Sequence, residues 1–144
     1  MKQRLPGLLC LLAALVVSMA AARRDGAHTA RFVRQNEAAL TALAEEALAA
    51  GFGGDFSYPG VKSVRYTVYM KDGTLYRPYV EFHMDSLIGY SGFYYSPADI
   101  PIPFQGVSDA LLTPTASGWY WEHRGNHGTT AKITDHWYSF EAWL

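Results

Sequence analysis

The chain has 144 residues, which is enough for one domain, and its formal net charge is -1. This charge gives no basic excess, which argues against nucleic acid as a partner. Aromatic residues make up 15% of the chain and charged residues only 17%, so the aromatic side chains need an explanation in the fold or in a binding surface.

Residues 1–24 have the pattern of an export signal. Lys2 and Arg4 precede the apolar run Leu8–Val17, and the small residues of Ala20–Ala22 suit signal peptidase. The alternative is an uncleaved anchor, because Leu5–Ala22 approaches the ~20 residues that span a bilayer. We therefore expect an exported protein, either secreted or anchored to the cytoplasmic membrane facing outward. Any membrane contact is expected through this signal peptide or anchor only.

Residues 25–144 are expected to form a single extracytoplasmic domain. Cys10 is the only cysteine and lies in the apolar run, so the domain has no disulfide and needs an ordinary apolar core. Without Lys2 and Arg4, 10 basic and 13 acidic residues are left, a net charge of -3. This charge argues against binding anionic polymers by electrostatic attraction. We expect no cofactor.

The first predicted element is a helix over Arg31–Ala50, after a short polar connection at Asp25–Ala30. The segment is rich in strong helix formers, and Gly51 marks its end. An apolar stripe at helical spacing predicts packing on a sheet, with an exposed partner-binding helix as the alternative. The stripe consists of Val33, Leu40, Leu43, Ala44 and Ala47.

Val61–Met84 predicts a β-hairpin, because two alternating runs flank the turn residues Lys-Asp-Gly. A three-residue loop over 71–73 brings the apolar faces together and places Val68 opposite Tyr76. The same loop type predicts a left-handed backbone conformation at Gly73.

After the hairpin, further strands are predicted at Leu87–Ser96, Trp119–Arg124, Thr129–Thr134 and Trp137–Trp143. The last two are either separate strands or one continuous strand. Prolines make Pro97–Ser117 irregular, and its apolar residues predict a cover over the core. The fold class is therefore α+β, with the N-terminal helix packed on an antiparallel sheet of five or six strands in a meander-like order.

The C-terminal strands have a predicted register. A loop over 125–128 places Tyr120 opposite Ile133, and a tight Asp135-His136 turn places Ile133 opposite Tyr138. The apolar face thus formed, which is expected to contact the helix, consists of Tyr120, Ala131, Ile133, Tyr138, Phe140 and Ala142. The opposite face then carries Trp119, Trp121, His123, Trp137 and Trp143. We expect Pro97–Ser117 to cover that face, with a binding cleft at the edge of the cover.

The histidines supply few catalytic patterns. His123 and His127 lie four residues apart, but the glycines around them indicate a loop, so we expect no metal site. No G-x-S-x-G motif is present. A small cell-envelope hydrolase using His123, His127 and Asp135 is kept as the alternative function.

The aromatic residues carry the main functional hypothesis. Their ordinary role is to fill the core, but an exposed group would form a platform for an extracytoplasmic glycan or partner protein. The candidate binding residues are Tyr90, Tyr94, Tyr95, Trp119, Trp121, His123 and His127. The favoured function is accordingly a non-catalytic binding or interaction module.

Three short patterns carry a family resemblance. They are Gly92-Phe93-Tyr94-Tyr95-Ser96-Pro97, Gly118-Trp119 and Trp137-Tyr138. In these patterns the chain resembles small exported proteins of Gram-positive bacteria that have no assigned activity. The resemblance implies export and covers most of residues 25–144, but it implies no substrate, cofactor or catalytic residue.

Overall fold

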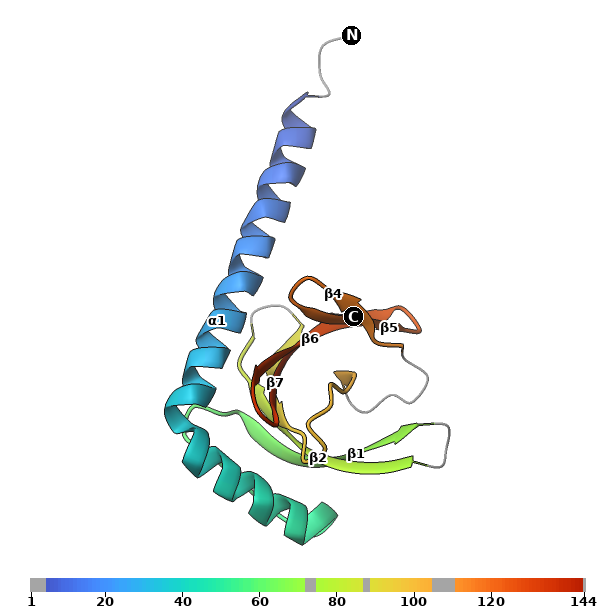
Figure 1. Ribbon diagram of the computed structural model, residues 1–144. Helices are drawn as coiled ribbons and strands as arrows, with labels where there is room; N and C mark the ends of the chain where they lie inside the picture. Colours follow the sequence, from blue (N-terminus) through green and yellow to red (C-terminus); the bar gives the residue numbers. More distant parts are fainter. Residues whose placement is uncertain (1–4, 72–74, 87–88, 105–110, 144) are drawn as a thin grey trace.

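The computed structural model describes residues 5–71, 75–86, 89–104 and 111–143, with side chains from residue 26 onward except those of residues 71, 75 and 76. One long helix lies outside a curved antiparallel sheet (Figure 1). In the part of the chain that is described in full, no helix is long and apolar enough to cross a membrane.

The helix α1 spans Leu5–Ala50 and is therefore longer than predicted. The expected polar connection at 25–30 is wrong, because these residues continue the helix and Thr29 is buried beside Met84. Gly51, at φ +65°, ends the helix in the left-handed conformation that glycine adopts most easily. Four of the five residues of the predicted stripe are fully buried: Val33, Leu40, Ala44 and Ala47. The stripe therefore forms the packing face of the helix.

Among the described residues, seven strands form the sheet: β1 (Ser63–Lys71), β2 (Leu75–Met84), β3 (Tyr90–Tyr95), β4 (Thr113–Thr115), β5 (Gly118–His123), β6 (Asn126–Thr134) and β7 (Trp137–Trp143). The α+β class is confirmed, but the prediction of five or six strands in one meander is wrong. The order β1-β2-β3-β7-β6-β5-β4 joins two meanders through the pair β3–β7. The additional strand β4 lies in the proline-containing segment, where its position at a sheet edge tolerates Pro114.

The predicted register of the first hairpin is wrong by two residues. Val68 lies opposite Pro78 rather than Tyr76, because Lys71 pairs with Leu75 and so belongs to the strand, not to the predicted loop over 71–73. A shift of two residues leaves every side chain on its predicted face, so the apolar sets still coincide.

Pro78 lies in a part of β2 that pairs with β1 alone, since β3 pairs only with Val80–Met84. A missing N–H is tolerated at such a position. The predicted backbone conformation of Gly73 falls outside the described residues.

The second hairpin, β5–β6, has a two-residue turn at Arg124-Gly125 rather than the predicted four-residue loop. Tyr120 consequently lies opposite Thr129, not Ile133. Arg124 and Gly125 have φ values of +50° and +87°. Positive φ at both central residues is the type I′ geometry, which suits the twist of a tight hairpin.

The third hairpin, β6–β7, contains the predicted tight turn at Asp135-His136, so these strands are separate. A register shift between Lys132 and Thr134 changes the pairing beyond the turn. Lys132, and not Ile133, lies opposite Tyr138. The predicted apolar face is therefore wrong in β7, because a shift of one residue moves side chains to the other face. Tyr138, Phe140 and Ala142 lie on the concave face, whereas Ile133 lies on the face that the helix covers, as predicted.

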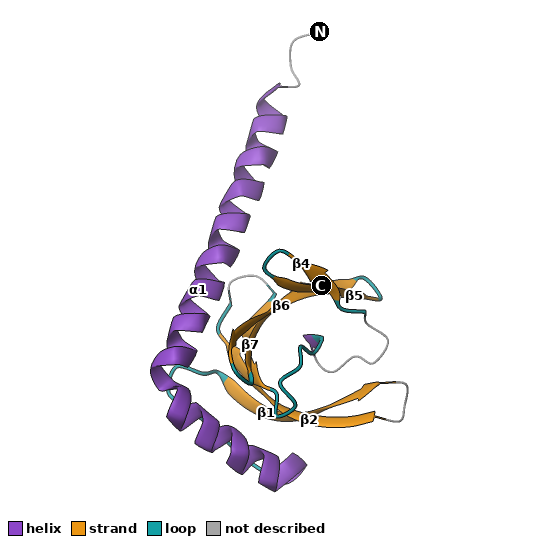
Figure 2. Cartoon of the chain, in the orientation of Figure 1, coloured by secondary structure: helices purple, strands orange, loops and turns teal. Residues whose placement is uncertain are grey.

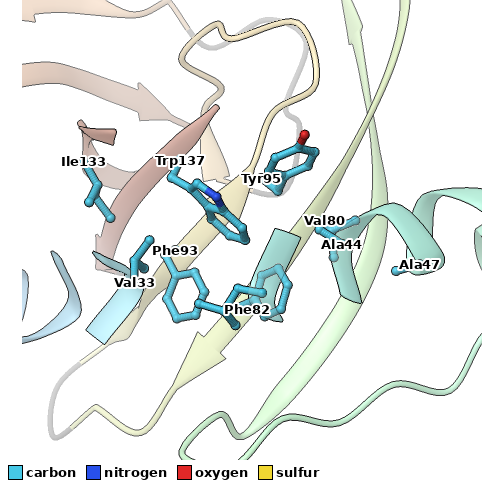
Figure 3. Close-up of a cluster of buried hydrophobic side chains, with 10 residues drawn as sticks. Val33, Ala44, Ala47, Val80, Phe82, Phe93, Tyr95, Ile133 and Trp137 are labelled. Carbon is cyan, nitrogen blue, oxygen red and sulfur yellow. The ribbon is translucent and has the colours of Figure 1, made fainter. Parts of the chain in front are cut away.

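The sheet has a packed core on each face. Figure 3 shows the convex core, where α1 covers the strands, and its buried members are Val33, Leu40, Ala44, Ala47, Val80, Phe82, Phe93, Tyr95, Ile133 and Trp137. Phe82 and Phe93 are stacked at 4.9 Å, and Trp137 Nε1 donates a hydrogen bond to Thr41 Oγ1 at 3.3 Å.

The concave core lies on the opposite face. Its buried members are Tyr69, Tyr79, Tyr94, Ile102, Phe104, Trp121, Tyr138, Phe140 and Ala142. The segment that follows β3 runs inside the curve of the sheet (Figure 2). It contributes Ile102 and Phe104 to this core.

Candidate functional site

The structure divides the seven candidate binding residues between the two faces. Alternation along the strands and the paired registers place these residues on the concave face: Tyr90, Tyr94, Trp119, Trp121 and His123. Tyr95 belongs to the convex core, and His127 lies on the convex face beside Trp143. Since Tyr94, Tyr95 and Trp121 are buried, they are core residues and cannot form an exposed platform.

The concave face is covered by the segment 97–104, as predicted for the cover. Phe104 is stacked on Tyr90 at 5.7 Å and on Phe140 at 4.9 Å, with the ring of Trp121 at 6.4 Å. The backbone N–H of Ile102 donates to Tyr94 Oη at 2.8 Å, which ties the segment to β3. Tyr90 is 45% exposed and marks the edge of the cover.

The indole of Trp121 packs against Gly128 of β6. A Cβ at Gly128 would lie 2.7 Å from Trp121 Cζ2, so only glycine leaves room for the indole. Trp121 Nε1 is buried and has no hydrogen-bond partner among the described residues. An unpaired buried donor costs about 1–3 kcal/mol, and the packing of the indole offsets this cost.

A buried polar group lies on β2 next to the concave core. Tyr79 Oη donates to Glu81 Oε1 at 2.9 Å, and His83 Nε2 lies 3.1 Å from Glu81 Oε2. Burial raises the pKa of Tyr79 far above its ordinary value, and the Glu81 carboxylate raises it further, so the hydroxyl remains a donor. His83 is enclosed by the rings of Phe104 and Phe140. The three side chains therefore form a buried hydrogen-bonded group beside the concave core.

Asp99 fastens the cover to the β6–β7 turn. Its carboxylate accepts hydrogen bonds from Lys132 Nζ at 2.7 Å, from the backbone N–H of His136 at 2.9 Å and from Tyr138 Oη at 3.0 Å. The bond from Lys132, followed by that from His136, lowers the pKa of Asp99 to about 2. Burial, with the Asp99 carboxylate, raises the pKa of Tyr138 to about 12.

Asp99 and His136 each have a strained, left-handed backbone conformation, with φ values of +49° and +66°. Such conformations cost roughly 1–3 kcal/mol each and persist only where surrounding contacts enforce them. The hydrogen bond between the two residues, and the bond from Ser96 N to His136 O at 2.8 Å, supply these contacts.

A row of aromatic rings on the convex face is partly exposed, and we call it the convex aromatic row. It consists of Tyr120 on β5, His127 on β6 and Trp143 on β7. The His127 and Trp143 rings are stacked at 5.6 Å, and Tyr120 lies 6.4 Å from His127. Tyr120 Oη donates to the exposed carboxylate of Glu122 at 3.1 Å.

Partial burial, followed by this hydrogen bond, raises the pKa of Tyr120, which keeps the hydroxyl neutral. The row therefore presents aromatic faces and a carboxylate on one side of the sheet.

The residues of the alternative hydrolase site are separated. His123 lies opposite Asn126, whereas His127 lies opposite Glu122, so the two imidazoles are on opposite faces of the sheet. Asp135 follows the far end of β6 and forms an ion pair with Lys132 at 3.2 Å. Within the described residues, no group of three or more His, Cys, Asp or Glu side chains is arranged to hold a metal ion.

Sequence reasoning identified His127 but missed Tyr120 and Trp143. The predicted register places Tyr120 on the apolar face under the helix and Trp143 on the same face as Trp121. The short Arg124-Gly125 turn and the register shift before Thr134 place the three rings together. The Gly-containing turn was visible in the sequence, whereas the register shift had no signal.

Comparison with protein-family models, with curated proteins and with solved structures found no match.

Proposed function

We propose that the chain is an exported or membrane-anchored, non-catalytic binding module that holds a neutral glycan on the convex aromatic row. The basic start at Lys2 and Arg4 and the apolar run Leu8–Val17 support an extracytoplasmic location. The resemblance to small exported proteins agrees with this location. The proposal about the ligand rests on the row itself.

The main observation in support of a binding role is that the row is a partly exposed aromatic cluster spanning three adjacent strands. Tyr120, His127 and Trp143 are neighbours on one face, while the indoles of Trp121 and Trp137 are buried in the two cores. A folded domain normally encloses such rings, so their grouping at the surface supports a binding role. Strands hold the three side chains in fixed relative positions, which lowers the entropy lost on binding.

The chemistry of the row suits a sugar ring. The C–H faces of a pyranose pack on aromatic rings, and its hydroxyls need acceptors such as the Glu122 carboxylate, which Tyr120 positions. Glu141 is on the same face of β7 and is half-buried. These acids, and a net charge of -3 once Lys2 and Arg4 are left out, disfavour anionic polymers and leave neutral glycans as the ligand class.

The test is binding of short neutral oligosaccharides of glucose, mannose and N-acetylglucosamine to the purified full chain, measured by calorimetry. We expect binding of at least one oligosaccharide, and we expect Trp143→Ala or Tyr120→Ala to weaken it by roughly tenfold, about 1.4 kcal/mol. Each variant removes part of the stacking surface.

Phe52→Ala is the matched control, because Phe52 is 78% exposed and lies on the 3-10 turn after α1, away from the row. Its affinity for the oligosaccharide should equal that of the wild type. An equal loss of affinity in all three variants would reject the row as the site. Oligosaccharide affinity that is unchanged by Trp143→Ala and Tyr120→Ala would also reject it. Binding of a partner protein at the row without glycan binding would reject the ligand class.

A further inference from the structure

The strand β1 is an unprotected edge of the sheet. The other edge, β4, has three residues and contains Pro114, two features that prevent strand addition. In contrast, β1 pairs with β2 in an uninterrupted register over Ser63–Lys71, with no proline of its own and no bulge. Half of its backbone N–H and C=O groups therefore face outward without a strand partner among the described residues.

The convex flank of this edge is apolar. Tyr66, Val68 and Met70 alternate along β1 on this face, and Met70 is 47% exposed. Phe52, at 78% exposure, lies with its ring 4.7 Å from that of Tyr66. Two of the large apolar side chains that the fold leaves exposed are thus beside the same edge. An added strand would cover them with every second side chain.

The concave flank of the edge is basic. Arg65 is exposed on this face of β1, and Arg77 of β2 lies directly across from Tyr69. Lys62, which precedes the strand, is 68% exposed and lies 3.8 Å from Asp85, which is 92% exposed, so the two form a weak surface pair. These cations are concentrated at one edge of a chain whose net charge is negative.

We infer that the β1 edge accepts an extended acidic segment of a partner polypeptide as an additional antiparallel strand. The segment alternates apolar and acidic residues, so that one set contacts Met70 and Phe52 and the other faces Arg65. A second copy of the chain is disfavoured as the occupant, because it would bring the same basic side chains to the same face. This surface is separate from the convex aromatic row and binds another class of ligand.

The test uses a fluorescent peptide of alternating Val and Glu residues and the full chain, followed by anisotropy. The acidic peptide should bind, and its affinity should fall as salt screens the charges. A peptide with Lys in place of Glu should bind at least tenfold more weakly. Equal binding of both peptides would overturn the charge argument, and binding of neither would overturn the proposal.

Two variants locate the peptide. Arg65→Gln should weaken binding by roughly threefold to tenfold through lost charge, and Phe52→Ser should do so through lost apolar contact. Arg31→Gln removes an exposed arginine of α1, and Tyr120→Ala alters the convex aromatic row; neither should change peptide affinity. A loss in these controls equal to that in Arg65→Gln would reject the site.

Hydrogen exchange supplies a readout of the backbone. Addition of the acidic peptide should slow exchange of alternate amides of β1, while those of β4 stay unchanged. Peptide binding without added protection in β1 would overturn strand addition. If the β1 amides are already protected without peptide and the protein has the mass of a dimer, the edge would instead be occupied by a second copy. That result would reject the acidic partner.

Discussion

Trp121 and Trp137 have the same side chain and the same degree of burial but different hydrogen bonding. Trp137 Nε1 donates to Thr41 Oγ1 on α1, whereas Trp121 Nε1 has no partner among the described residues. Both indoles fill a core, one on each face of the sheet. The indole N–H therefore stabilises the fold at one position and opposes it at the other.

This difference predicts unequal effects of the same substitution. Trp→Phe removes similar apolar area at both positions, but Trp137→Phe also loses a hydrogen bond, while Trp121→Phe removes an unpaired donor. We expect Trp137→Phe to lower the free energy of unfolding by about 1–2 kcal/mol more than Trp121→Phe. Urea denaturation of both variants measures the difference. Equal losses would show that Trp121 Nε1 has a partner in the folded protein.

Among the buried polar residues, Glu81 illustrates what sequence alone does not reveal. Alternation in β2 places Tyr79, Glu81 and His83 on the face opposite that of Val80. The structure buries that set as well, because the segment 97–104 covers the concave face. Whether polar side chains of one strand are buried thus depends on a segment that is distant in the sequence.

At the scale of elements, the cover depends on Asp99, whose carboxylate joins it to Lys132, His136 and Tyr138. The pKa of Asp99 is lowered to about 2, from an ordinary value of 3.8. The folded state thus favours the ionised carboxylate. Asp99 contributes stability that is present above its ordinary pKa and is lost as the pH falls toward its folded value.

We therefore expect the stability of the wild type to decline between pH 4 and pH 2, and Asp99→Asn to make this decline shallower. Asparagine tolerates the left-handed backbone at this position and still accepts a hydrogen bond from His136, so the cover should stay in place. Urea midpoints across this pH range test the effect. An unchanged acid dependence in the variant would show that other carboxyl groups control it.

The elements also show which parts of the fold are predictable from sequence. Each predicted strand after the first hairpin has a counterpart, because strand periodicity and glycine turns are local signals. Strand registers are harder to predict from the sequence, because the shift before Thr134, which moves Tyr138 and Phe140 to the concave face, has no local signal. The long-range pair β3–β7 also has no local signature.

At the scale of the whole molecule, the two cores explain the high aromatic content. Helix α1 and the segment 97–104 cover opposite faces of one curved sheet (Figures 1 and 2). Aromatic side chains that point to either face of β2, β3 and β7 are therefore buried. The candidate site was predictable only in part, since most aromatic residues proposed for binding fill these cores. The convex aromatic row emerges from the assembled sheet rather than from any one segment.

The separation of core from surface indoles makes the central claim directly measurable. Residues Trp119 and Trp121 lie on the concave face, Trp137 lies under α1, and Trp143 belongs to the convex aromatic row. Each indole N–H gives its own signal in a ¹⁵N-labelled protein, so one titration observes all of them together.

The decisive measurement is the titration of the labelled full chain with a neutral oligosaccharide, followed through its indole signals. The proposed function predicts that the Trp143 signal shifts with ligand concentration, while the signals of Trp121 and Trp137 stay in place. Trp143→Phe identifies the shifting signal by removing it. A shift confined to Trp119 or Trp121, or no shift with any neutral oligosaccharide, would contradict binding at the convex aromatic row.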